Sequence, residues 1–408
     1  MKPGQSLARR WSATTAPYLA LKGIGQGLEF LGWVVLARRL GAEPFGVLAV
    51  ATLVCRYGGL IADWGASISG VRDVAQGQRP GVVRALERRR WETALPLAAL
   101  YLIGAWLSGH ANLMMLVTVL LSIGLNRDWI SLGQERGGRS ALPIFAQGMV
   151  LLAIATLGST SQPAIAVAVA YALSLILSLA LNRMPKAPAG KYRIQGWMLL
   201  AILSNQVLST ADTFLLATLA SVSLAGIYSA VYRLPNGWLA LLVILRGGLL
   251  PLATTTLRDD PKQFLRLRRS SLRLSAIGGA SLIAAAPLAF VAIPLVLGPA
   301  YRSGRWPAVL LLVATAIATA AAPLHHLYLA FGDDRSYGWY LLSAAVLNVA
   351  LNIALIPLAG MMGAAVATLA ANAYLAGALW LTLQRRVGAI MAGDTGEVGA
   401  AGVVRPTS

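Results

Sequence analysis

The sequence has few charged residues and almost no cysteine. Only 12% of its 408 residues are Asp, Glu, Lys or Arg, whereas soluble domains carry about 25%. Hydrophobic residues make up 57%, and the mean hydropathy is +0.67. This composition excludes an ordinary soluble protein and is typical of an integral membrane protein. The single cysteine, Cys55, excludes an internal disulfide and a cysteine metal site, because both need a second thiol.

The motifs of common enzymes are also missing. The sequence contains no P-loop, no HExxH and no GxSxG, and no long loop outside the apolar segments carries paired carboxylates. His325 and His326 lie close to Pro323, but no further ligands stand at a metal-binding spacing, so we expect them to be hydrogen-bonded structural residues. We therefore expect a protein that is not an enzyme and that has no cofactor and no metal.

What the chain has instead is a series of apolar segments. A helix needs roughly 20 apolar residues to cross a bilayer. The fold we predict is an all-α integral membrane protein of about twelve transmembrane helices. The predicted spans are 14–37, 44–66, 91–109, 112–130, 142–158, 163–182, 197–219, 225–250, 272–297, 306–331, 338–357 and 361–384.

The basic residues between the spans predict the orientation. With both termini in the cytoplasm, almost all Lys and Arg of the loops fall on the cytoplasmic side, where such residues are retained. The opposite side then holds only Arg38, Arg39, Arg302 and Arg305. The net charge of +19 is therefore explained by loops that face anionic lipid headgroups, and we expect contact with membrane lipids and not with nucleic acid.

The chain also resembles itself at a shift of 180 residues. Gln26 aligns with Gln206 and Gly46 with Gly226, and the stretch 40–48 maps onto 220–228. Six spans per half predict two pseudo-symmetric six-helix lobes, and transporters commonly bind substrate at the interface of such halves. We predict an N-terminal lobe over 1–195, a C-terminal lobe over 196–386 and a disordered cytoplasmic tail over 387–408.

Charged and polar residues inside four of the spans are the candidate site. A charge at the bilayer centre costs roughly 2.5–3.5 kcal/mol, so each should face protein or water. In the first, second and seventh spans, helical spacing places these residues on one face. These residues are Lys22, Gln26 and Glu29 in the first span, Arg56 and Asp63 in the second, Asn205, Ser209 and Asp212 in the seventh, and Arg233, Asn236 and Arg246 in the eighth. The simplest arrangement has them lining one aqueous cavity between the halves.

A second interpretation needs no cavity. From their depth along the spans, Glu29 could pair with Arg56, Lys22 with Asp63 and Asp212 with Arg233, so that the charges only fix helix packing. Arg246 has no obvious partner and could extend to the cytoplasmic headgroups. The four cations outnumber the three anions, which favours an electropositive cavity for a phosphate-bearing ligand.

Several stretches resemble the Wzx-type family of polysaccharide flippases. The R-x-L-G-x-x-x-F-G pattern of that family is matched within 37–46, and its I-P-x-x-G-x-x-G-A-A pattern within 356–365. Further similar stretches are 62–65, 70–75, Asp212 with 226–233, 297–301 and 348–353. The resembling stretches follow one another in order over nearly the whole chain.

The resemblance implies the fold of the multidrug/oligosaccharidyl-lipid/polysaccharide exporter (MOP) superfamily. It implies a flippase that moves undecaprenyl-diphosphate-linked oligosaccharide across the bacterial inner membrane by alternating access, in surface polysaccharide (O-antigen or exopolysaccharide) synthesis. Expected partners are the lipid-linked oligosaccharide, a polysaccharide polymerase and chain-length proteins. We assign roles by position: Lys22, Arg56, Arg233, Arg246, Gln26 and Asn236 are candidates for substrate binding, and Glu29, Asp63 and Asp212 for gating or ion coupling.

Three other functions are weighed against this one. A multidrug/cation antiporter of the same fold would favour acidic residues in its cavity, whereas cations lead here. A lipid II flippase usually has two further spans. An integral membrane enzyme of glycan assembly would need a catalytic loop outside the membrane, and the sequence shows none.

Overall fold

The structure, a computed structural model, is helical in every regular element that it describes. It describes residues 16–71, 74, 80–134, 136–159, 161–183, 196–246 and 249–391. Within these residues, nine helical segments are long and apolar enough to cross a membrane, and the last of them, Asp334–Gly388, has the length of two spans. The protein is therefore a multi-pass membrane protein, as the composition predicts.

The chain divides into two compact units, which are described separately. The first unit covers Met1–Leu203 and Val222–Ala230, and the second covers Ser204–Ser221 and Val231–Ser408. The helices α10 (Gly196–Leu219) and α11 (Val222–Arg246) each divide between the units. The predicted lobe boundary at residue 195 stays a prediction for that reason.

The remaining helices belong to one unit each. In the first unit they are α2 (Ala16–Leu40), α3 (Ala42–Asp63), η2 (Ala66–Gly70), α5 (Pro80–Leu107), η3 (Ala111–Leu116), α6 (Val117–Leu125), α7 (Asp128–Gly133), α8 (Gly137–Leu157) and α9 (Pro163–Leu181). In the second unit they are α12 (Leu249–Asp259), α13 (Pro261–Ala285), η4 (Ala286–Leu288), α14 (Ala289–Val296), η5 (Pro299–Gly304), α15 (Arg305–Leu329) and α16 (Asp334–Met391).

These helices account for all twelve predicted spans. Gly360, with φ 52° and ψ −128°, breaks α16 into two helices between the predicted spans 338–357 and 361–384. Only glycine adopts such a backbone conformation readily, so the glycine at position 360 permits this break. Helix α16 also continues to Met391, beyond the predicted start of the tail, and residues 392–408 lie outside the described residues.

The helix that contains the third predicted span begins before that span. We expected the span over 91–109 with a cytoplasmic loop before it, and α5 begins at Pro80. The additional turns include Glu87 and Arg90, which lower the local hydropathy although both side chains are buried. A proline at the first helical position is favourable, since it loses no hydrogen bond there.

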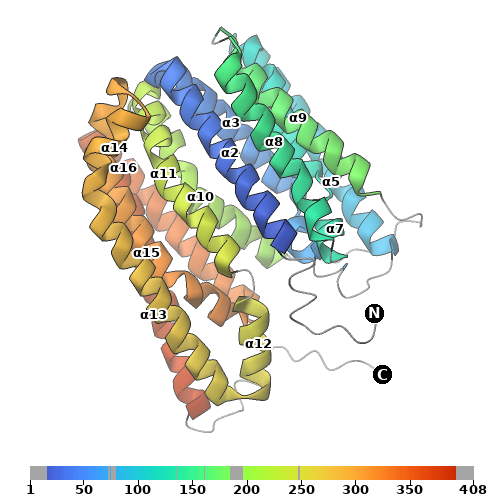
Figure 1. Cartoon of the computed structure of the whole chain (residues 1–408), viewed down its shortest axis with the longest axis vertical. Coiled ribbons are helices and arrows are strands. Elements are labelled where there is room, and N and C mark those ends of the chain that lie inside the picture. The colour runs from blue at the N-terminus through green and yellow to red at the C-terminus, as the bar shows by residue number, and fades with distance from the viewer. Residues whose placement is uncertain are drawn as a thin grey trace. The chain divides into compact units, whose positions relative to one another are not determined.

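In the first unit, α2 and α8 lie side by side over their length (Figure 1). Glycines allow this close approach, as is common in membrane helix pairs. A Cβ atom on Gly25 would lie 2.7 Å from the Cα of Phe145, and one on Gly148 would overlap the carbonyl oxygen of Gly25. Helix α8 also packs on α9, and α3 packs on α6 and α5.

Helices α3 and α11 cross closely at their first turns. A Cβ atom on Gly46 would overlap the carbonyl oxygen of Val222, and one on Gly226 would overlap that of Ala42. The two contacts are reciprocal, and the residues involved differ by 180 positions, which is the shift of the internal repeat. The crossing thus relates the two helix starts by a local two-fold symmetry, as the repeat predicts.

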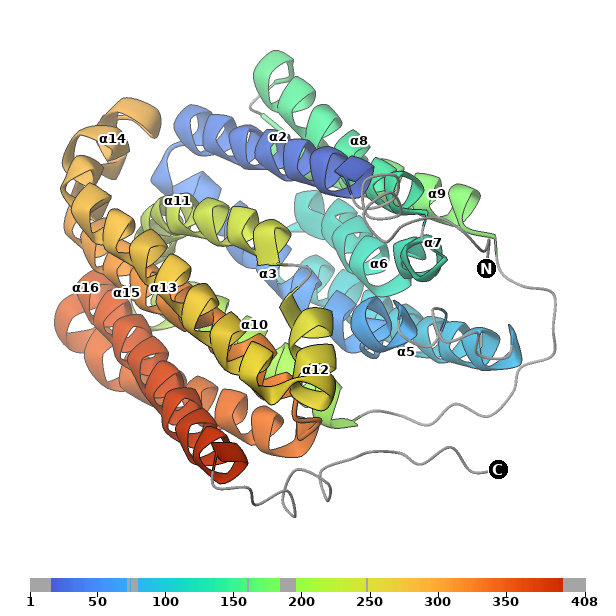
Figure 2. The same cartoon turned by 60° about the horizontal axis from the view of Figure 1, so that its bottom comes forward.

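In the second unit, α15 is the central helix. It packs against α13 and α16, and the three helices run beside one another in Figures 1 and 2. Its buried face carries small residues such as Ala314, Ala321 and Thr319, together with the larger Leu311 and Tyr328. Small residues on a central helix let its neighbours come close, and this compensates for the weak hydrophobic drive inside a membrane.

Candidate functional site

A buried network of charges ties helices of the first unit together at the end of α3. The carboxylate of Asp63, the last residue of α3, receives a hydrogen bond from Arg90 Nη2 at 3.0 Å on Oδ1. Its other oxygen, Oδ2, accepts from Ser67 N at 3.1 Å and from Ser67 Oγ at 2.8 Å. Arg90 is fully buried and Asp63 is 3% exposed. Both oxygens of Asp63 are therefore satisfied without solvent.

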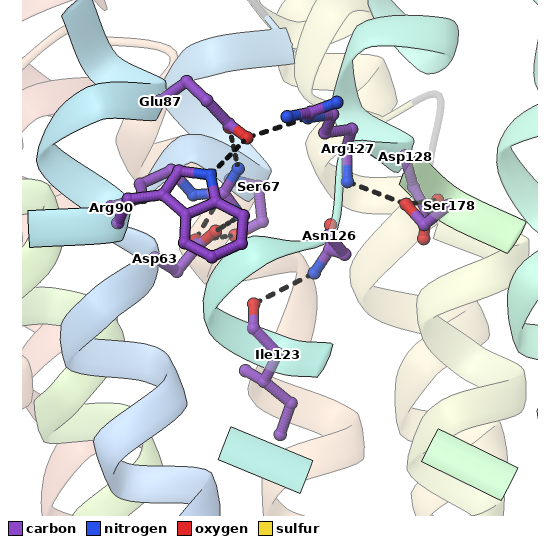
Figure 3. A network of polar contacts seen from close by, with 10 residues as sticks. Asp63, Ser67, Glu87, Arg90, Ile123, Asn126, Arg127, Asp128 and Ser178 are labelled. Atoms are coloured by element: carbon purple, nitrogen blue, oxygen red, sulfur yellow. Dashed lines mark hydrogen bonds and ion pairs between the residues drawn. The ribbon is translucent and has the colours of Figure 1, made fainter. Parts of the chain in front are cut away.

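A second carboxylate, that of Glu87, links this pair to α7. Arg90 Nη1 donates to Glu87 Oε2 at 3.1 Å, and Arg127 Nε donates to Glu87 Oε1 at 2.8 Å (Figure 3). Trp91 Nε1 donates to the same Oε1 at 3.2 Å. Two carboxylates thus meet two guanidinium groups, so this part of the network carries no net charge. It joins the helices but offers no excess charge to a ligand.

Beside it, the junction between α6 and α7 is anchored to α9. Arg127 N donates to Ser178 Oγ at 2.7 Å, and Ser178 Oγ donates to Asp128 Oδ1 at 2.6 Å. Asn182 extends the anchor, because it accepts a short hydrogen bond from Ser131 Oγ. Lys22 and Arg90 both interact electrostatically with the Asp128 carboxylate. Asp128 therefore has cations near it from α2 and α5.

Asp63 forms a different pair from the one considered above, and its partners were not among the predicted site residues. We considered a pair of Lys22 with Asp63, but Asp63 pairs with Arg90. Glu87 and Arg90 were assigned to a loop, and Arg127 and Asp128 to a span without notable charges. One signal could have found them: Glu87 and Arg90 lie one helical turn apart, a spacing that suits one face of a helix.

The three predicted residues of α2 do not form an ion pair with α3. Lys22 Nζ donates to Tyr18 Oη at 2.8 Å and lies 5.1 Å from the centroid of that ring. Glu29 Oε1 accepts a hydrogen bond from Tyr171 of α9 at 3.0 Å. Gln26 Oε1 is buried and has no hydrogen-bond partner among the described residues. Each of the three side chains is partly buried, and together they give α2 a polar face.

Arg56 does not pair with Glu29, which corrects our second interpretation for that pair. Within the part of the chain that the structure describes, Arg56 makes no ion pair with any carboxylate. Its side chain is half-buried near the middle of α3. A charge at that depth is costly. Arg56 is thus the best-defined candidate in this unit for contact with an anionic ligand.

In the second unit, Asp212 is fully buried in α10. Its Oδ2 accepts from Thr368 Oγ1 at 3.1 Å, and its Oδ1 accepts from Thr213 N at 2.9 Å. Tyr232 interacts electrostatically with this carboxylate. Arg233 and Asn236 are half-buried in α11, and the pair of Asp212 with Arg233 stays a prediction. The side chain of Arg246 lies outside the described residues.

A polar cluster between α15 and α16 involves residues to which no role was assigned. Arg386 Nη2 contacts Asp333 Oδ2 at 2.5 Å, and its guanidinium lies 4.9 Å from the ring centroid of Tyr328. Burial by itself would raise the pKa of Asp333, but hydrogen bonds from Ser336 and from Arg386 outweigh it and hold that pKa below its usual value. Asp333 therefore stays charged and keeps the ends of the two helices together.

The two histidines are hydrogen-bonded, as predicted. His325 Nδ1 lies 2.9 Å from the hydroxyl oxygen of Tyr337, and His326 Nδ1 lies 3.2 Å from the carbonyl oxygen of Ala322. Among the described residues, no three His, Cys, Asp or Glu side chains come close enough to hold a metal ion.

Comparison with known proteins gives matches in structure but not in sequence. No protein-family model matches the chain, and no curated protein matches it. An inward-facing multidrug resistance MATE family transporter of the MOP superfamily aligns with 96% of this chain and 97% of its own, with a TM-score of 0.57 and 12% identity. The chain therefore has the fold of this transporter. The predicted all-α membrane fold is thereby confirmed, whereas the orientation of the termini stays a prediction.

Two further structures show how widely this fold is shared. An outward-facing multidrug resistance MATE transporter covers 94% of this chain and 96% of its own, with a TM-score of 0.59 and 13% identity. A MOP superfamily transporter from Pyrococcus furiosus, described as having a binding pocket of reverse polarity that suggests a different function, covers 93% and 96%, with a TM-score of 0.59 and 10% identity. Identities this low establish the fold alone.

Proposed function

We propose that this protein is a membrane transporter that works by alternating access. The proposal rests on the fold, because both inward-facing and outward-facing transporters align with almost the whole chain. An alternating-access transporter needs polar groups within the bilayer, and these must face protein or water. The polar face of α2, with Arg56 on α3, supplies such groups in the first unit, and Asp212, Arg233 and Asn236 supply them in the second.

Two substrate classes follow from different observations. The comparisons favour a multidrug antiporter, because the aligned structures include multidrug resistance transporters. For a cationic drug, Glu29 is the candidate coupling residue, because this residue is partly exposed, whereas Asp63 and Asp212 are buried.

The flippase hypothesis draws its support from the sequence and from charge. The Wzx-like stretches follow one another over nearly the whole chain, and Arg56 and Lys22 make no ion pair among the described side chains. A diphosphate is the kind of group that a buried guanidinium binds well, with two parallel hydrogen bonds. On this proposal, Lys22, Arg56 and Arg233 contact the diphosphate, while Glu29, Asp63 and Asp212 serve gating or ion coupling.

One pair of variants separates the two hypotheses. In a strain that lacks this protein, a flippase defect would cause lipid-linked glycan to accumulate in the inner membrane. We expect the wild-type protein to remove the accumulated lipid-linked glycan. At equal membrane levels of the two proteins, Arg56→Ala should leave at least about tenfold more of it in the membrane. Arg88→Ala is the matched control, because Arg88 is an exposed arginine of α5.

The same strains are tested for efflux of a cationic dye. A multidrug antiporter predicts dye efflux that Glu29→Gln abolishes and Arg56→Ala leaves intact, without any glycan phenotype. That result would contradict the flippase hypothesis. A chain that restores neither activity would contradict the transporter proposal itself.

A further inference from the structure

A row of basic side chains runs along the first turns of α13. Its four members recur at every third or fourth position, which places them on one face of the helix, and all four are exposed: Lys262, Arg266, Arg269 and Arg273. We call them the α13 basic stripe. Arg266 Nη2 lies 3.9 Å from Asp260 Oδ2, and no other ion pair of the stripe occurs among the described side chains. The stripe therefore has cations to offer to an anionic ligand.

The other side of these turns is packed against the rest of the second unit. Phe264 is fully buried, and its ring meets the ring of Phe331 edge-on, with the centroids 5.9 Å apart. The guanidinium of Arg268 lies 5.6 Å from the ring centroid of Trp380 in α16. The backbone that carries the stripe is thus held in place. A ligand that binds the stripe has to order side chains only, which lowers the entropic cost of binding.

Further along α13, the same face becomes apolar. Ile277, Ala280 and Ala284 continue the helical spacing after Arg273, and all three are exposed. Ile277 is 67% exposed. A row of exposed apolar side chains on a membrane-spanning helix is a surface for lipid. The basic stripe and this lipid-facing row therefore lie on one continuous face of α13.

The length of this helical segment sets the depth of the stripe. The segment runs over Lys262–Val296, and α14 lies at the opposite end of α13 from α12 (Figure 1). Residues 274–296 rise about 35 Å, enough for a hydrocarbon core of about 30 Å. Arg273 then lies at the boundary of the core. Arg269 lies about 6 Å further out, within a headgroup layer about 5–8 Å thick, and the longer reach of Lys262 and Arg266 lets them extend toward it.

This depth selects the ligand. The phosphate groups of phospholipids occupy the headgroup layer, and a guanidinium binds phosphate through forked hydrogen bonds. An acidic soluble protein would have to enter that layer to contact Arg269 and Arg273, whereas phospholipids are already there. The retention of basic loops in the cytoplasm depends on the number of cations and not on the helical face that carries them. The alignment of the four side chains therefore needs a further reason, and anionic lipid supplies it.

We propose that the α13 basic stripe binds the headgroup phosphates of anionic phospholipids, with Arg269 and Arg273 as the central contacts. On the predicted orientation these lipids belong to the cytoplasmic leaflet, whose surface is negatively charged. Lipid bound to the folded helix stabilises the folded protein. The inference goes beyond the proposed function, because it concerns lipids that surround the protein and holds for either class of transported substrate.

The test uses the full-length protein in a neutral detergent, titrated with phosphatidylglycerol. Native mass spectrometry counts the bound lipids, and thermal unfolding measures the stabilisation. We expect phosphatidylglycerol to bind and to raise the Tm of the wild-type protein. Phosphatidylcholine, whose headgroup has no net charge, and inorganic phosphate at the same concentration should each raise it much less.

Two double variants identify the site. Arg269→Gln/Arg273→Gln should weaken phosphatidylglycerol binding at least about tenfold, because each basic residue near an anionic surface contributes to the attraction. Arg269→Lys/Arg273→Lys keeps the charge and should keep most of the binding. The matched control is Arg88→Gln/Arg89→Gln at the exposed start of α5, where both arginines pair with Glu92. It removes the same charge and should change the affinity by no more than about twofold. Thermal unfolding without lipid verifies that every variant is folded.

Three results would overturn the proposal. The first is equal binding of phosphatidylglycerol and phosphatidylcholine to the wild-type protein. The second is an unchanged affinity of Arg269→Gln/Arg273→Gln, or an equal loss in the α5 control, which would mean that only the total charge matters. The third is tighter binding of a polyglutamate peptide than of phosphatidylglycerol, lost in the same variant, which would make the stripe a docking surface for an acidic protein.

Discussion

At the scale of single residues, the main feature is the buried ion pair of Asp63 and Arg90. Removing both charges from water is expensive, and the pair is retained because every oxygen of Asp63 and both terminal nitrogens of Arg90 have partners. Such a pair adds little net stability over apolar residues, but the loss of one partner leaves an uncompensated buried charge. The two residues therefore depend on each other much more than an exposed pair would.

We predict that Arg90→Ala lowers the free energy of unfolding by about 3–5 kcal/mol. Arg88→Ala on the same helix removes a pair with Glu92 in which Arg88 is 73% exposed, and it should change stability by no more than about 0.5 kcal/mol. Thermal unfolding in one detergent measures both. Equal losses for the two variants would mean that Arg90 is not held in the buried network.

At the element scale, glycines decide which helices can touch. The crossing of α3 and α11 places two backbones in contact through Gly46 and Gly226. Because the contact is reciprocal, a side chain on either glycine pushes the same two helices apart. The same device joins α2 to α8 through Gly25 and Gly148.

We predict that Gly46→Ala and Gly226→Ala each destabilise the protein by about 1–3 kcal/mol, the usual cost of overpacking. The sign of the change in stability is informative, because replacing glycine by alanine inside a helix otherwise stabilises a protein by about 1 kcal/mol. Gly27→Ala in α2, where a Cβ atom meets nothing within 4 Å, should be neutral or stabilising. If all three variants behave alike in thermal unfolding, the close crossing is absent in the membrane.

At the scale of the whole molecule, the distribution of basic residues predicts the orientation in the membrane. An even number of spans places both termini on one side, and the rule of positive loops assigns that side to the cytoplasm. The short turn between α8 and α9, residues 158–162, then faces the other side. Orientation is a property of the chain in its membrane, so it needs a test of its own.

We predict that green fluorescent protein fused after Ser408 fluoresces and that alkaline phosphatase at the same position is inactive. A fusion at Ser161, between α8 and α9, should show the reverse. Matched expression of the four fusions in the inner membrane is the control. Active phosphatase at the C-terminus would contradict the predicted topology.

The sequence by itself determined the apolar segments from which the spans are built, the interruption between 338–357 and 361–384, and the repeat that the α3–α11 crossing reflects. These follow from apolar runs of one bilayer thickness and from single backbone positions, which are local properties of the chain. Only the tertiary structure decided which charges meet. Asp63 and Arg90 are 27 residues apart, and Glu87 and Arg127 are 40 apart. Depth along a span limits the possible partners, but rotation and packing of the helices select among them, and neither is a property of one segment.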